Sequence, residues 1–409
     1  MALLNEHFLK LSDNSLFSEI EKKVNSFKVI HPKADLIHLG TEDVILPIPA
    51  IAADAMQRAI DEMGKESTFR GYGPVKGYNF LIDAILKNDY APYGIQFEPG
   101  EIFINDGAKC DIGNIGNILR HDNTIGITDP THPMYINSSV LSGRTGEMEK
   151  DGSWSNVIYI PCRESNHFIP ELPPQRVDIV YLCYPNNPTG IALPRHELKK
   201  WVNYALENDT LLICDSTYKA YIQGSDIPHS IYEIKGARKV AIEICSFSKC
   251  AGFTGIRCGY TTVPKELTAV TLSGERVQLN PIWEQYQKIR YNGTSYISQK
   301  GAEALYSPEA KEQIRKNIIY YMNNARMIKK ALENMGLKVY GGKDAPYLWV
   351  KAPRPLSSMK FFEKLLFDAQ ILSTPGIAYG SGGEGFIRLT AFERKERCEE
   401  AVQRICRYL

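Results

Sequence analysis

Ser246-Phe-Ser-Lys249-Cys-Ala-Gly-Phe-Thr-Gly-Ile-Arg257-Cys-Gly259 is a loop rich in Ser and Gly that separates two strand-like runs, Val240 to Cys245 and Cys258 to Val263. A charged lysine at the end of a buried strand loses its hydration, which is unfavourable unless another group pairs with the charge or the amine reacts and loses it. A lysine with a lowered pKa is a nucleophile for carbonyl groups. The loop therefore suggests Schiff-base chemistry at Lys249. Taken alone, it fits a surface lysine better, because most lysines are exposed.

The chain around this loop has a regular pattern. From residue 100 to 263, short apolar runs alternate with amphipathic segments of helical length, which predicts a mostly parallel sheet covered by helices. Ligands bind such sheets beyond the carboxyl ends of the strands, so the residues after each run are candidates for a site. The expected strands are Ile102 to Ile104, Ile125 to Thr128, Val157 to Ile160, Ile179 to Cys183, Leu211 to Cys214 and Ala241 to Cys245.

The segments outside this region predict helices and a smaller unit. Residues 13–31 and 50–63 have helical spacing, and Leu36 to Leu39 reads as a short strand. A long helix is expected to start at Ser307-Pro308 and to end near Gly336. The remainder, with Tyr347 to Val350 and Phe386 to Leu389, is typical of a smaller α+β unit.

Composition excludes several functional classes. The 409 residues carry 48 Lys and Arg against 47 Asp and Glu, so no global charge favours nucleic acid or an anionic membrane. No apolar run could span a bilayer, and the N-terminus lacks the order of a signal peptide, so the cytoplasm is expected. The nine Cys and eight His lack the spacing of metal ligands, and neither a metal site nor a disulfide framework is expected.

Three further loops at expected strand ends could carry chemistry. Gly107 to Lys109 would place backbone N–H groups at the start of a helix, where phosphate can bind, although an ordinary turn is as good an explanation. Tyr184 to Gly190 could direct an amide toward a ligand, but Asn-Pro is also a common turn. Asp215 ends an apolar run, and a buried carboxylate needs a partner that its neighbours do not supply, such as a cationic ligand.

Together the motifs in these loops resemble those of the fold-type-I pyridoxal-phosphate aminotransferases. The resemblance covers the whole chain, from the N-terminal arm to the C-terminus. The motifs are Asn187-Pro-Thr-Gly190, Asp215-x-x-Tyr218, Ser246-x-x-Lys249 and Arg257 eight positions further on. Other motifs are similar to the LL-diaminopimelate aminotransferase subgroup: Gly71-Tyr-Gly73, Asp106-Gly-Ala-Lys109-Cys-Asp111, Asn292-Gly, Ala345-Pro-Tyr-x-Trp-Val350 and Gly382-Gly-Glu-Gly-Phe-Ile-Arg388.

The resemblance implies an α/β fold with two domains and a homodimer with shared active sites. Residues 1–48 would form an N-terminal arm and part of the small domain, 49–300 the large domain that binds pyridoxal phosphate, and 301–409 the C-terminal small domain. The substrates would be an amino acid similar to LL-diaminopimelate and a 2-oxoacid such as 2-oxoglutarate, converted by a ping-pong mechanism in lysine biosynthesis.

The resemblance also implies roles for single residues. Lys249 would form the Schiff base, Asp215 would keep the ring nitrogen of pyridoxal phosphate protonated, and Tyr218 and Asn187 would bind its phenolic oxygen. His132, in the place of a tyrosine of the subgroup, would lie beside the ring. The phosphate would be held by Ser246, Arg257, the N–H groups of Ala108 and Lys109, and Tyr72 of a second subunit.

Arg388 would clamp the substrate α-carboxylate, but other substrate positions depart from the subgroup. Glu42 stands where the subgroup has glycine, Val75 where it has an acidic residue for the distal ammonium, and His132 where it has tyrosine. Whether diaminopimelate is retained or the substrate has changed stays open. The expected substrate-binding residues are Gly40, Glu42, Val75, Lys109, Asn187, Asn292 and Arg388.

Two other classes of function are considered. A lyase, decarboxylase or oxidase could use the same cofactor and fold, because the fate of the Cα carbanion depends on fine geometry. A non-catalytic binding module is disfavoured by the intact Lys249, Asp215, Tyr218, Arg257 and Arg388.

Overall fold

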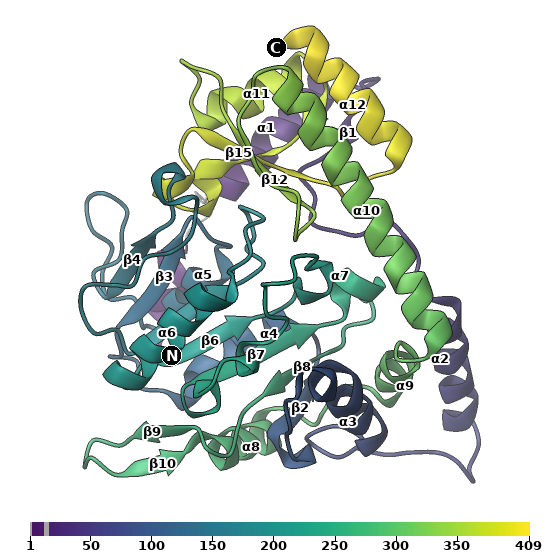
Figure 1. Cartoon of the computed structure of the whole chain (residues 1–409), viewed down its shortest axis with the longest axis vertical. Coiled ribbons are helices and arrows are strands. Elements are labelled where there is room, and N and C mark those ends of the chain that lie inside the picture. The colour runs from purple at the N-terminus through teal and green to yellow at the C-terminus, as the bar shows by residue number, and fades with distance from the viewer. Residues whose placement is uncertain (1, 12–15) are drawn as a thin grey trace.

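The structure is a computed structural model that describes residues 2–11 and 16–409, and its largest element is a seven-stranded sheet (Figure 1). The strand order is β2-β8-β7-β6-β5-β3-β4, and only β8 runs antiparallel to its neighbours. The mostly parallel sheet expected from the sequence is therefore confirmed. Its strands are β2 (Ile102–Asn105), β3 (Ile125–Asp129), β4 (Val157–Pro161), β5 (Ile179–Cys183), β6 (Leu211–Asp215), β7 (Ala241–Ser246) and β8 (Gly259–Thr262).

Helices cover both faces of this sheet, which explains why its strands are apolar throughout. In β5, Ile179 and Tyr181 pack in one cluster with α4 (Ala108–Ile115) and α8 (Leu279–Arg290). Val180 and Leu182, the alternate positions, pack in a second cluster with α6 (Arg195–Asn208). Side chains alternate between the faces of a strand, so a strand covered on both sides reads as one continuous apolar run.

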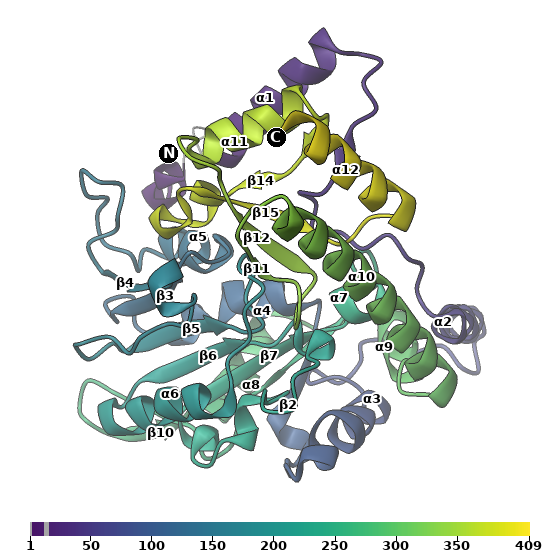
Figure 2. The same ribbon diagram turned by 45° about the horizontal axis from the view of Figure 1, so that its top comes forward.

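A second, antiparallel sheet has the order β11-β12-β15-β14 and lies beside the C-terminal helices (Figure 2). Helix α10 (Pro308–Asn334) connects the two regions, since it contacts α2 (Ala50–Met63) and also β11 and β12. The Ser307 side chain caps its N-terminus, so the predicted start is confirmed. The strands and other helices here are β11 (Val339–Gly341), β12 (Tyr347–Lys351), β14 (Thr374–Pro375), β15 (Phe386–Thr390), α11 (Ser358–Phe367) and α12 (Lys395–Tyr408).

Residues 16–38 pack on this second region, whereas Glu6–Lys10 contact α5 (Met134–Leu141). Helix α1 (Leu16–Ile30) agrees with the predicted helix 13–31, whose residues 13–15 lie outside the described residues, and it packs on α11 through Phe27. Strand β1 (Ile37–His38) pairs in parallel with β13 (Ile371–Leu372).

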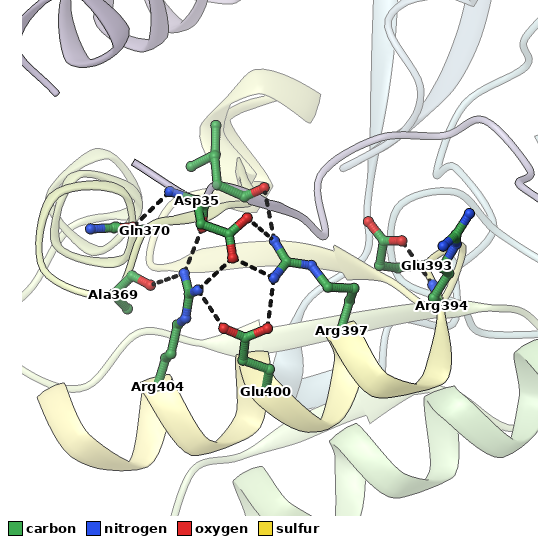
Figure 3. A network of polar contacts seen from close by, with 9 residues as sticks. Asp35, Ala369, Gln370, Glu393, Arg394, Arg397, Glu400 and Arg404 are labelled. Atoms are coloured by element: carbon green, nitrogen blue, oxygen red, sulfur yellow. Dashed lines mark hydrogen bonds and ion pairs between the residues drawn. The ribbon is translucent and has the colours of Figure 1, made fainter. Parts of the chain in front are cut away.

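An ion-pair network fixes the segment just before β1 to α12. The Asp35 carboxylate accepts hydrogen bonds from Arg397 and Arg404, and Glu400 binds both arginines (Figure 3). The network therefore joins residue 35 to the last helix of the chain.

The remaining elements are helices and one β-hairpin. Helix α2 has the predicted bounds and packs on α9 (Tyr296–Ala304). The hairpin of β9 (Thr268–Val270) and β10 (Arg276–Gln278) was not predicted. Within residues 2–11 and 16–409, no helix is both long and apolar enough to cross a membrane. The other helices are α3 (Asn79–Ile85), α5 (Met134–Leu141) and α7 (Ser248–Ala251).

Candidate active site

The carboxyl ends of the parallel strands meet at a cavity of about 370 Å³. Its position agrees with the rule that ligands bind beyond these strand ends. The structure brings most of the predicted site residues to its wall: Glu42, Ala108, Lys109, His132, Asn187, Asp215, Tyr218, Ser246, Lys249 and Arg257.

Lys249 lies in α7, the short helix that follows β7. Its Nζ atom donates a hydrogen bond to the main-chain oxygen of Glu42, and its own main-chain oxygen accepts one from Tyr221 Oη at 2.7 Å. Burial lowers the pKa of the Lys249 amine, while the nearby Glu42 and Asp43 carboxylates oppose that change. A larger fraction of this amine is therefore neutral and nucleophilic than in an exposed lysine.

Asp215 ends β6 and is held by neutral donors. Its Oδ2 accepts a hydrogen bond from Tyr135 Oη at 2.7 Å, and its Oδ1 accepts from the Thr217 amide at 3.0 Å and the Thr217 hydroxyl at 2.6 Å. These contacts orient the carboxylate and leave its charge available to a cationic group in the cavity. Sequence reasoning missed Tyr135 and Thr217. Thr217 stands inside the motif Asp215-x-x-Tyr218, and Tyr135 follows His132 by three positions, but only the folded turns bring them to Asp215.

Several hydrogen-bond donors gather at one end of the cavity. The N–H groups of Ala108 and Lys109 belong to the first turn of α4, where the helix offers no acceptor. Gly107 has φ of 99°, and a Cβ atom there would lie 2.7 Å from Nη2 of Arg257. This glycine lets the guanidinium approach the helix start closely. The Ser246 hydroxyl, which donates to Ser248 Oγ at 3.0 Å, completes a set of donors suited to a phosphate group.

Tyr218 and His132 each make a contact that the sequence did not predict. The hydroxyl oxygens of Tyr218 and Tyr347 lie 2.5 Å apart. The Nε2 atom of His132 lies 3.5 Å from Oε2 of Glu42. Tyr347 stood in a quoted motif without an assigned role, and its ring is fully buried on β12.

Arg388 lies on β15 and is 1% exposed. Its guanidinium forms an ion pair with Glu42 and donates to Asn187 Oδ1 at 2.9 Å and to the Gly40 main-chain oxygen at 2.7 Å. Burial would raise the pKa of Glu42, but Arg388 and His132 hold it well below its usual range. Glu42 is therefore ionised at neutral pH.

Five predicted residues do not line this cavity. Arg388 is buried and paired with Glu42, which does line it, and Gly40 binds Arg388 through its main-chain oxygen. The other three are Tyr72, Val75 and Asn292. Tyr72 is 90% exposed, on the loop before α3. Val75 lies next to the turn at Gly293, where a Cβ atom would be 3.7 Å from the Val75 oxygen, and so close to Asn292. The structure thus places Tyr72, Val75 and Asn292 away from the cavity of their own chain.

Comparison with known proteins agrees with this geometry. The family described as Aminotransferase class I and II matches residues 34–405. The chain therefore belongs to this family, and it is a pyridoxal-phosphate-dependent aminotransferase of fold type I, as the sequence predicted.

Among its relatives, the LL-diaminopimelate aminotransferase of Phocaeicola vulgatus is 63% identical over 409 residues and covers 100% of both chains. That of Methanosphaera stadtmanae is 48% identical over 402 residues, with 98% of each chain covered. The solved L,L-diaminopimelate aminotransferase from Chlamydomonas reinhardtii superposes with a TM-score of 0.92 at 40% identity, covering 100% of this chain and 99% of that one.

Proposed function

We propose that this aminotransferase moves the α-amino group of a diamino acid similar to LL-diaminopimelate to a 2-oxoacid such as 2-oxoglutarate. The observation that carries the reaction type is that one cavity is lined by Lys249, Asp215 and Glu42, and that Glu42 is paired with Arg388. The substrate class is supported by the full-length identity to the named relatives.

The residues present fit pyridoxal phosphate. Asp215, oriented by Tyr135 and Thr217, would accept the N–H of its ring, and Tyr218 and Asn187 would donate to its phenolic oxygen. Ser246, Arg257 and the N–H groups of Ala108 and Lys109 would hold its phosphate. When bound, the cofactor supplies an electron sink for the bonds at the substrate Cα.

The protein's own groups then divide the work. Lys249 would hold the cofactor aldehyde and, once released as a neutral amine, would carry the proton from Cα of the substrate. Its lowered pKa suits both tasks. Arg388 would bind the α-carboxylate with two parallel hydrogen bonds, which fixes the orientation of the Cα–H bond.

The assembly is also part of the proposal. The exposed Tyr72 suits a homodimer in which this tyrosine reaches the cofactor phosphate bound by the other subunit. Val75 and Asn292 would then lie near the distal end of the substrate bound by that subunit. Residues 1–48 and 301–409 would form the small domain around the cavity, and 49–300 the large one. We place the enzyme in the cytoplasm.

Single-turnover reactions with purified enzyme test the proposal. The holoenzyme is mixed with LL-diaminopimelate, lysine, ornithine, glutamate or an aromatic amino acid, and the visible absorbance and the oxoacid product are measured. LL-diaminopimelate should bleach the cofactor and give one oxoacid per site. A faster reaction with another amino acid would show that the substrate has changed, and product without aminated cofactor would indicate an oxidase, lyase or decarboxylase.

A further inference from the structure

We propose that Glu42 occupies the α-carboxylate position of the site, so that an amino-acid substrate binds only by displacing Glu42 from Arg388. This inference rests on the proposed function, because it assumes that Arg388 receives the substrate carboxylate. It makes Glu42 a determinant of specificity. The residue weakens the binding of amino acids and leaves the binding of amines that lack an α-carboxylate unopposed.

The hydrogen bonds of Arg388 leave no place for a second carboxylate while Glu42 is bound. The two terminal nitrogens carry four N–H groups. Nη1 donates to Glu42 Oε1 and to Asn187 Oδ1, and Nη2 donates to the Gly40 oxygen at 2.7 Å and lies 3.5 Å from Thr374 Oγ1. Among the described residues the remaining Nε has no partner, and it is buried.

Both carboxylate oxygens of Glu42 have partners at the place where Arg388 would receive a substrate carboxylate. Its Oε1 accepts a second hydrogen bond from Asn187 Nδ2 at 3.1 Å, and its Oε2 lies 3.5 Å from His132 Nε2. Glu42 lines the cavity, whereas the guanidinium behind it is almost fully buried. A carboxylate entering from the cavity therefore meets a carboxylate first, and the two like charges repel each other.

Glu42, not Arg388, is the partner that can leave. Arg388 stands in the middle of β15, which is paired with β12 on one side and β14 on the other. Its Cζ atom lies 5.0 Å from the ring centroid of Tyr347 and 5.1 Å from that of Tyr379. The Glu42 side chain is 27% exposed and lies on the irregular segment between β1 and α2. Rotation of this side chain into the cavity frees the Nη1 N–H group that now binds Glu42, without disturbing either sheet.

The test compares two donors that differ only in the α-carboxylate. Lysine and 1,5-diaminopentane are reacted with the holoenzyme in single-turnover experiments, for the wild type and for Glu42→Gln and Glu42→Gly. Both substitutions should raise kcat/KM for lysine about ten-fold or more, which corresponds to about 1.4 kcal/mol. They should change kcat/KM for the diamine by a smaller factor, which records the effect of Glu42 on Lys249 alone, so the ratio of lysine to diamine should rise. Asp43→Asn is the matched control, because it removes a neighbouring carboxylate of the cavity that has no contact with Arg388 among the described residues.

A second measurement does not depend on turnover. Glutarate, a dicarboxylate without an amino group, is titrated into the holoenzyme by calorimetry, and it should bind at least ten-fold more tightly to Glu42→Gln than to the wild type. Equal affinities, or a lysine to diamine ratio that the Glu42 variants leave unchanged or decrease, would overturn the inference. If no amino acid reacts with any variant but glutarate still shows the difference, the proposed function fails while the role of Glu42 stands.

Discussion

The Nζ atom of Lys249 donates a hydrogen bond to the main-chain oxygen of Glu42, a residue 207 positions earlier in the chain. The side chain of the same glutamate binds Arg388. One short segment before α2 thus contacts both the predicted nucleophile and the predicted carboxylate-binding group. A change at Glu42 should therefore alter the chemistry of the lysine as well as the binding of the substrate.

The first prediction concerns the pH dependence of cofactor addition. Only the neutral amine of Lys249 attacks an aldehyde, so the rate at which apoenzyme takes up pyridoxal phosphate should rise with pH. It should level off below the ordinary lysine pKa of 10.5, because burial lowers the pKa of Lys249. Glu42 raises the pKa, so Glu42→Gln should move the profile to lower pH. Stopped-flow absorbance measures the rate, and a shift to higher pH would contradict the assignment.

The second prediction compares how much the charge of Asp215 and its hydrogen bond from Tyr135 contribute to kcat. Asp215→Asn removes the charge that would keep the ring nitrogen protonated, and we expect kcat to fall by about 100-fold or more. Tyr135→Phe removes one donor to the carboxylate and should reduce kcat by about ten-fold or less. Steady-state kinetics on cofactor-saturated protein gives both values. Equal effects of the two substitutions would show that Asp215 acts only through its orientation.

The third prediction tests the shared active site. Lys249→Ala should be inactive, and Tyr72→Ala should bind the cofactor weakly. A mixed dimer would contain one intact site, formed by Lys249 of one subunit and Tyr72 of the other. After unfolding and refolding of an equimolar mixture, about a quarter of the wild-type activity should return. Each variant refolded alone is the control, and a mixture no more active than the controls would exclude sites built across two subunits.

The fourth prediction concerns acid stability. Glu164, just after β4, binds Lys351 of β12, Lys338 just before β11 and Tyr340 of β11, and these donors lower its pKa to about 2. A depressed carboxyl pKa contributes stability above its unfolded value of 4.5 and loses that contribution as the pH falls toward about 2.

Glu164→Gln should therefore lower the free energy of unfolding at pH 7 by about 0.5–1 kcal/mol, a small value because the pair is partly solvated. The difference from the wild type should shrink between pH 4.5 and 2, as measured by urea unfolding. The exposed Glu171→Gln is the control. A difference that persists at pH 2 would argue for a packing defect instead.

The sequence predicted the parts of the molecule that depend on local patterns. Strand ends and the helix 50–63 could be read from apolar runs and spacing, and Asp215 and Lys249 stand at such ends. Glu42 and Arg388 are 346 positions apart in the chain. Glu42 lies on the loop between β1 and α2, and Arg388 lies on β15 of the four-stranded sheet. No local pattern encodes such a contact, and the same holds for Tyr135 and Asp215. The β9–β10 hairpin could not be predicted because its strands have three residues each, too few for an apolar pattern to show.

The pairing of β1 with β13 also has a consequence for the order of assembly during translation. The ribosome makes Ile37 long before its partner Ile371. The last strand of the seven-stranded sheet ends at residue 262, so this sheet can fold on the nascent chain. Strand β1, which lies just before Glu42, has no partner until β13 emerges near the end of the chain. The part of the site that contains Glu42 and Arg388 is therefore completed last, because Arg388 and β13 both belong to the end of the chain.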